Sequence, residues 1–186
     1  MSGRELTSYS KYLACDGGPH LLLPFSARGD WKGCTDESDP LNPDTDYGRA
    51  CLVEPPIGLV NVGAQKALVL AGNPLLTTWR GSPREGRLDL YVLEAWDEID
   101  LDLLVDSAAS ATQNTTDSGL RWVLKDGGIS LMFAGEAPGK TNTVSDNTVY
   151  GEIPIPVSPG TYKISTGSFD GEHGRLWIAR LERETG

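Results

Sequence analysis

The sequence predicts a mainly β fold of antiparallel, sandwich-like sheets, with one or two short helices at most. Short apolar or alternating segments recur along the chain, and turn-forming residues, 22 Gly and 12 Pro, separate them. Alternation between apolar and polar residues is clearest in 88–92 and 176–181, and it is typical of strands with one buried face. A chain of 186 residues is long enough to bury a substantial core.

Strands are expected wherever an apolar run lies between turn signals. These segments are 12–15, 20–23, 50–53, 58–62, 67–70, 75–79, 88–93, 120–124, 129–133, 152–157, 162–165 and 176–181. Residues 96–104 differ, because Trp96, Ile99, Leu103 and Leu104 follow helical spacing with acidic residues between them. A strand over 99–103 alternates equally well, but the acidic first turn favours a short helix.

The polar segment 107–118 predicts a linker between an N-terminal β unit, 1–106, and a C-terminal β unit, 119–186. The two units either stand apart or pack as one domain. Residues 12–23 align with residues 122–133, and each range contains an Asp-Gly-Gly turn between two apolar runs. This similarity predicts two hairpins and suggests an internal duplication, with chance as the alternative because Gly-Gly hairpins are common.

The charge balance limits the classes of partner. A net charge of −10 excludes nucleic acid and anionic membranes as expected partners and favours a basic protein. The alternative is that the acidity serves solubility alone. No signal peptide or membrane-spanning run is evident, and three cysteines without metal-ligand spacing fit a reducing compartment, so we expect a cytoplasmic protein.

No residue pattern predicts a catalytic centre, a cofactor site or a metal site. His20 and His173 stand outside any zinc-hydrolase motif, and His20 beside an apolar run is expected to be a hydrogen-bonded structural residue. The acidic residues of 36–46 could bind calcium through oxygen ligands, but their spacing is not that of an EF-hand. We therefore expect a protein that is not an enzyme.

Three local motifs in the first half carry more information. They are Gly17-Gly18-Pro19 before an apolar run, Trp31-x-Gly33, and a box that contains Asp46, Tyr47, Arg49, Ala50 and Cys51. Together they resemble the Imm21 family of bacterial immunity proteins. The resemblance implies a cytoplasmic antidote that binds and neutralises a cognate toxin of a polymorphic toxin system. On their own chemistry, the motif residues are expected to be structural rather than to contact a partner.

The loop 29–47 is the candidate contact surface. Its acidic residues Asp30, Asp36, Glu37, Asp39 and Asp44 are predicted to face a basic toxin. One hypothesis is a nuclease toxin, whose phosphate-binding groove these residues would occupy. Trp31 either closes the core or anchors the partner. The alternatives from other classes are a carbohydrate- or ligand-binding β module and a small hydrolase built on His20. A solvated loop without a partner is the remaining interpretation.

Overall fold

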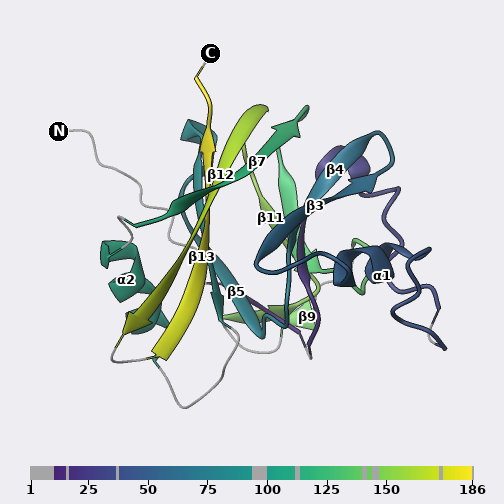
Figure 1. Cartoon of the computed structure of the whole chain (residues 1–186), viewed down its shortest axis with the longest axis horizontal. Coiled ribbons are helices and arrows are strands. Elements are labelled where there is room, and N and C mark those ends of the chain that lie inside the picture. The colour runs from purple at the N-terminus through teal and green to yellow at the C-terminus, as the bar shows by residue number, and fades with distance from the viewer. Residues whose placement is uncertain are drawn as a thin grey trace.

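The computed structural model describes residues 11–15, 17–36, 38–93, 100–111, 114–139, 142–143, 147–171 and 174–185. Across these residues the chain forms two β-sheets and two α-helices (Figure 1). Strand pairing is antiparallel except between β1 and β10, which run parallel. The predicted mainly β, sandwich-like fold is confirmed.

The larger sheet has eight strands. Their order is β7 (Thr116–Leu124), β12 (Gly160–Gly171), β13 (Gly174–Arg183), β6 (Arg87–Leu93), β5 (Leu76–Ser82), β1 (Tyr12–Ala14), β10 (Thr148–Tyr150) and β9 (Asn142–Thr143). The smaller sheet has five strands, in the order β11 (Glu152–Ile155), β8 (Ile129–Phe133), β2 (His20–Pro24), β4 (Gln65–Leu70) and β3 (Ile57–Val62).

The main core lies between the two sheets. Strand alternation places Leu22 of β2 in this core, together with Leu131 of β8 and Leu90 of β6. The neighbouring residues Leu21 and Leu23 point to the opposite face of the five-stranded sheet, where they are also fully buried. Both faces of this sheet are therefore covered.

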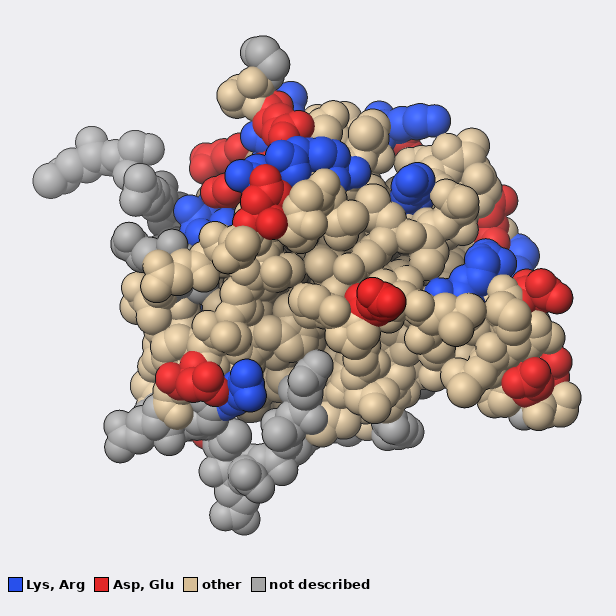
Figure 2. Space-filling view, viewed as in Figure 1, with Lys and Arg blue, Asp and Glu red and all other residues tan. Residues whose placement is uncertain are grey.

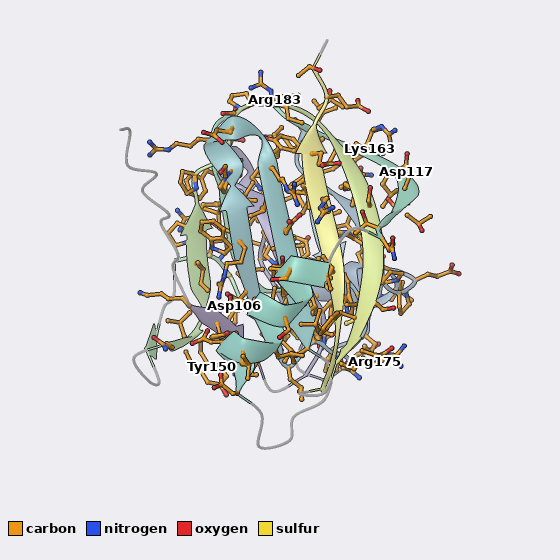
Figure 3. All side chains as sticks on the ribbon, turned by 90° about the vertical axis from the view of Figure 1, so that its left-hand side faces the viewer. Asp106, Asp117, Tyr150, Lys163, Arg175 and Arg183 are labelled. Atoms are coloured by element: carbon orange, nitrogen blue, oxygen red, sulfur yellow. The ribbon has the colours of Figure 1, made fainter. Side chains whose placement is uncertain are left out.

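A helix covers part of each outer face, so the molecule has four layers (Figure 1). On the eight-stranded sheet, α2 (Leu101–Ala111) buries Leu104, Val105 and Ala108 (Figure 3). On the five-stranded sheet, α1 (Asp46–Cys51) buries Ala50. Two short 3-10 helices, Phe25–Ala27 and Pro83–Glu85, lie in connections.

The two predicted Asp-Gly-Gly hairpins are wrong. In both cases the segment carries the chain from the eight-stranded sheet to the five-stranded sheet, so β1 and β2 do not pair, nor do β7 and β8. The reason is that β2 is apolar on both faces, and its burial requires a central place between β4 and β8. The internal duplication stays a prediction.

The segment 107–118, predicted to be a linker, has regular structure at both ends. Residues 107–111 continue α2, whose small residues pack on the sheet, and residues 116–118 begin β7. The described part of the helix predicted over 96–104 is helical, while residues 94–99 lie outside the described residues. Strands of the ranges 1–106 and 119–186 pair in both sheets, at β6–β13 and β2–β8.

Candidate functional site

The candidate site is the outer layer on the five-stranded sheet, residues 29–54, which we call the acidic layer. Seven of the chain's 26 acidic residues and two of its 16 basic residues lie in it, so it carries half of the net charge of −10. It consists of the loop that follows β2, helix α1 and the first residues after that helix. It lies on the opposite side of the molecule from α2 (Figure 1).

Helix α1 positions the layer. Thr45 caps its N-terminus, because the Thr45 hydroxyl accepts a hydrogen bond from the backbone N–H of Gly48 at 3.0 Å. Ala50 packs beneath the helix with Val60 and Val62 of β3. The strand predicted for residues 50–53 is therefore wrong: the Thr45 cap and the burial of Ala50 stabilise a helix instead.

Trp31 lies in the core rather than on the surface. Only 1% of the residue is exposed, and its indole N–H donates a hydrogen bond to the carbonyl of Ala134 at 3.1 Å. This burial agrees with the interpretation of Trp31 as a residue that closes the core. In this structure its ring offers a partner almost no surface to contact.

The sequence motifs meet around the ring of Tyr47. The edge of this ring contacts Phe133, with 5.7 Å between ring centroids, and the Tyr47 hydroxyl lies against Gly18. A Cβ atom on Gly18, which has φ of 106°, would stand 2.5 Å from that hydroxyl oxygen. The Tyr47 N–H donates to the carbonyl of Gly33, and the carbonyl of Pro19 accepts from Ala134. Burial raises the pKa of Tyr47 to about 12.

Asp46 joins the loop to the helix. One carboxylate oxygen accepts a hydrogen bond from the backbone N–H of Lys32, and the other pairs with Arg49. Cys51, at the end of the same helix, is partly buried, and this burial raises the pKa of its thiol. Gly17 adopts a φ of 117° in the connection before β2. These contacts are of the kind expected for structural residues, and the structural role of the motifs stays a prediction.

The other carboxylates of the layer face solvent. Across the described residues, Asp30, Asp39, Asp44 and Glu54 form no ion pair. Asp36 accepts hydrogen bonds from Ser38 and Asp39, and the Ser38 hydroxyl is the main cause that lowers its pKa. Glu37 lies outside the described residues.

The amino group of Lys32, the single lysine of the layer, donates to the carbonyl of Gly29. The negative charge of the layer is therefore not neutralised from within. Figure 2 shows acidic side chains at the right-hand edge of the molecule, in the region of α1 and the loop before it.

Two leucines of the acidic layer were not identified from the sequence as candidate site residues. Leu41 is 63% exposed and Leu52 is 66% exposed, the two highest values among the large hydrophobic residues that the structure describes. A leucine in the polar segment between Pro40 and Pro43 was the available signal, because such a segment has no strand or helix period that would bury it.

His20 is brought together with Cys15 and Thr77. Its Nδ1 lies 2.7 Å from the Thr77 hydroxyl, and its Nε2 lies 3.1 Å from the Cys15 sulfur. The ring is fully buried, and burial lowers its pKa to about 3. This neutral, buried imidazole connects β2 to β5 across the two sheets, and His20 is hydrogen-bonded within the fold, as expected.

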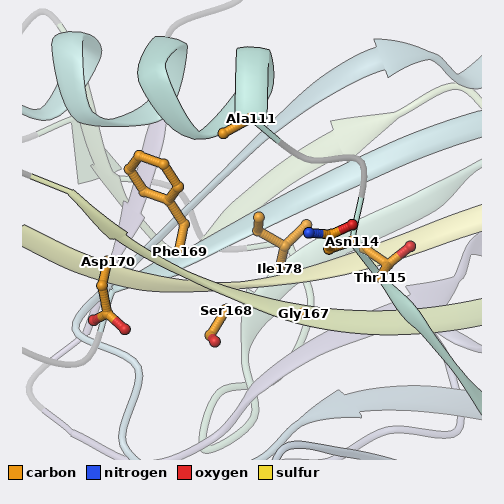
Figure 4. A pocket seen from close by; sticks show the side chains of 8 residues that line it. All are labelled: Ala111, Asn114, Thr115, Gly167, Ser168, Phe169, Asp170 and Ile178. Atoms are coloured by element: carbon orange, nitrogen blue, oxygen red, sulfur yellow. The ribbon is translucent and has the colours of Figure 1, made fainter.

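A small cavity of about 270 Å³ lies elsewhere, between the end of α2 and strands β12 and β13 (Figure 4). Phe169 and Ile178 supply its apolar part, and Asn114 and Ser168 supply polar groups. Its one carboxylate, Asp170, pairs with Arg175 at 3.2 Å. Among the described residues that line it, there is no histidine and no cysteine to serve as a base or nucleophile.

In the described part of the chain, no three His, Cys, Asp or Glu side chains gather closely enough to bind a metal ion. No helix there has the length and apolar character needed to cross a membrane. All three cysteines, Cys15, Cys34 and Cys51, are free thiols.

One protein family, described as Immunity protein 21 (Imm21), has a family model that matches residues 11–174. The match includes all three motifs, both helices and most of the strands. No curated protein and no solved structure matches the chain.

Proposed function

Because the chain belongs to the Immunity protein 21 family, and is therefore an immunity protein of a toxin system, we propose that it neutralises its toxin by stoichiometric binding through the acidic layer. The toxin is a basic protein, and the immunity protein covers its active groove without chemical change to either partner. A nuclease fits best, since a groove that binds phosphate is lined with Lys and Arg.

One observation carries this proposal. Among the described residues, the exposed carboxylates of Asp30, Asp39, Asp44 and Glu54 have no cation partner, and they lie in a layer that Trp31 and its neighbours fix to the sheet. Like charges repel one another, so the excess of carboxylates over cations in this layer is unfavourable in the isolated protein. A basic partner reverses the sign of this interaction.

The electrostatic field of the layer acts mainly on the rate of association. Opposite fields steer two proteins together before they touch, and salt screens this attraction over a length of about 8 Å at physiological ionic strength. The proposed surface should therefore speed the encounter with the toxin in low salt.

The test replaces three exposed carboxylates in the variant Asp30→Asn/Asp39→Asn/Asp44→Asn. The probe is the catalytically inactive toxin domain of the protein encoded beside this gene, and stopped-flow fluorescence gives the association rate constant. We expect association to slow about ten-fold or more at low salt, with a flatter dependence on ionic strength, because the steering field is weaker.

The matched control removes equal charge from the other face of the molecule, in the variant Asp106→Asn/Asp117→Asn/Asp170→Asn. These residues lie on α2, β7 and β12, and each is exposed. Association should change far less than in the first variant. Equal slowing in both variants would show that net charge matters and the acidic layer does not.

The structure does not favour the carbohydrate-binding alternative. A sugar-binding face uses exposed aromatic rings, whereas the described large hydrophobic residues with high exposure include one aromatic, Phe25, at 37%. The hydrolase alternative required His20 beside Cys34 or a carboxylate. In the structure, the His20 ring meets Cys15 and Thr77 instead.

A further inference from the structure

Leu41 and Leu52 belong to two segments that meet at α1, although eleven positions separate them in the sequence. Asn42, the neighbour of Leu41, lies directly against Gly48 of the helix, because a Cβ atom on Gly48 would stand only 1.9 Å from the Asn42 carbonyl oxygen. Leu52 follows Gly48 by four residues and donates its N–H to the Gly48 carbonyl. Residues four apart share a helix face, so the turn with Leu41 and the end with Leu52 are neighbours.

The core has no place for either side chain. Ala50 fills the contact between α1 and the five-stranded sheet, and Trp31 and Tyr47 fill the space beside it. Both leucines sit on ordered backbone, since Asn42 donates to the Asp39 carbonyl and Thr45 donates to the Asn42 carbonyl. Two apolar side chains are thus presented to solvent from a fixed platform.

Carboxylates flank both leucines along the chain. Asp39 and Asp44 lie on either side of Leu41 in the loop, and Glu54 follows Leu52 by two residues. All three are exposed and, across the described residues, form no ion pair. An apolar centre with a polar rim is the usual composition of a protein interface.

The charge of the rim selects the occupant. A second copy of the chain would bring like charges together, and nucleic acid or an anionic membrane would be repelled. A protein with apolar recesses inside a basic surface complements both parts. We infer that Leu41 and Leu52 are the apolar anchors of the acidic layer and insert into such a surface, which on the proposed function is that of the toxin.

Anchors and carboxylates should affect different rate constants. Burying a leucine stabilises the docked complex after the encounter, so its loss speeds dissociation, whereas the carboxylates act mainly on association. The test is the variant Leu41→Ser/Leu52→Ser with the same inactive toxin domain, followed by stopped-flow association and by dissociation after dilution. We expect dissociation about ten- to a hundred-fold faster, with association changed less than about three-fold.

The control is Leu103→Ser on α2, another leucine that is largely exposed, at 45%, on the other side of the molecule. It should leave dissociation unchanged. All three leucines are exposed, so the variants should fold with an unchanged unfolding midpoint in urea.

If the wild-type protein binds the toxin domain and the double variant dissociates at the wild-type rate, the anchor assignment is wrong and the proposed function stands. If the wild-type protein fails to bind the toxin domain, the proposed function fails and the anchor assignment with it. A variant that slows association as strongly as it speeds dissociation would also overturn the separation of roles.

Discussion

The outer face of the eight-stranded sheet and the acidic layer are both rich in charge, but they use it differently. On the sheet, Asp89 pairs with Arg180 at 2.7 Å, and Asp117 pairs with Arg121 at 3.2 Å and with Lys163 at 3.3 Å. Figure 2 shows the two signs interleaved over β7, β12 and β13, and Figure 3 shows Asp117 beside Lys163. In the acidic layer, Asp46 is the only described residue with such a pair.

This difference separates charge that maintains the fold from charge that remains available to a partner. A paired carboxylate has already exchanged water for an internal cation, so a second protein gains little by approaching it. An exposed carboxylate without a cation keeps its full field outside the molecule. Paired and unpaired carboxylates look the same in the sequence, and only their positions in the fold distinguish them.

The largest loss of stability is expected when the buried ion pair of the eight-stranded sheet is broken. Asp89→Ala should lower the free energy of unfolding by about 3–5 kcal/mol, because it leaves Arg180 buried without its carboxylate. Urea unfolding followed by tryptophan fluorescence measures this change. The toxin association rate of the folded fraction should remain that of the wild type.

The control for this variant is Asp170→Asn, which breaks an exposed pair on the same sheet. The Asp170 and Arg175 side chains are 69% and 74% exposed, so solvent screens their attraction and the loss should be small. A small effect of Asp89→Ala, similar to that of Asp170→Asn, would mean that the sheet's buried pair does not stabilise the fold.

We predict a pH dependence of stability that we assign to His20, a residue that belongs to neither of the two charged regions. Burial lowers the pKa of His20 to about 3 in the folded protein, below the ordinary value of about 6.5 for an exposed histidine. Below pH 6.5 the unfolded chain binds a proton that the folded protein rejects, so stability falls as the pH falls. The loss should reach about 2 kcal/mol between pH 8 and pH 5.

The measurement is urea unfolding at a series of pH values for the wild type and for His20→Gln. The variant should lose most of the dependence over this range. Asp117 does not contribute over this range, because its ordinary pKa of about 4 and its folded pKa, which the hydrogen bond with Arg121 lowers to about 2, both lie below pH 5. An equal pH dependence in the variant would assign the effect to other groups.

Local sequence pattern sufficed for most of the fold, and it failed where tertiary contacts decide. The alternation of residues 88–92 predicts β6 and the face that carries Leu88 and Leu90, but the opposite face, with Tyr91, is buried as well instead of facing solvent. Helix α1 was missed because its six residues are too few for a helical period, although Thr45 before Asp46 is an N-cap signal. The crossing between sheets at Gly17-Gly18 depends on which strands β2 meets, which no local pattern encodes.

The candidate site also has features that the sequence predicts and features that it does not. Its acidic residues and the family motifs can be found in the sequence, because charge and spacing are local properties. That Trp31 is buried while Leu41 and Leu52 are exposed could not be found, because both facts follow from the way α1 and its loop pack on the five-stranded sheet.

The smallest stability effect, and the one most specific to the acidic layer, is expected at Gly48. In an ordinary helix, Gly→Ala stabilises by about 0.5–1 kcal/mol. Here the added Cβ atom would meet the Asn42 carbonyl oxygen at 1.9 Å, so Gly48→Ala should instead lower the free energy of unfolding by about 1 kcal/mol and push the turn of Leu41 off α1. Toxin dissociation should become faster, because the turn that carries Leu41 would shift relative to the helix end that carries Leu52.

Gly29→Ala is the control for this variant. Gly29 lies in the same layer with no atom within 4 Å of the added Cβ, so the substitution should change neither the free energy of unfolding nor the dissociation rate. A Gly48→Ala variant that gains stability and keeps the wild-type dissociation rate would show that the turn and the helix are independent, and that the acidic layer is not one rigid surface.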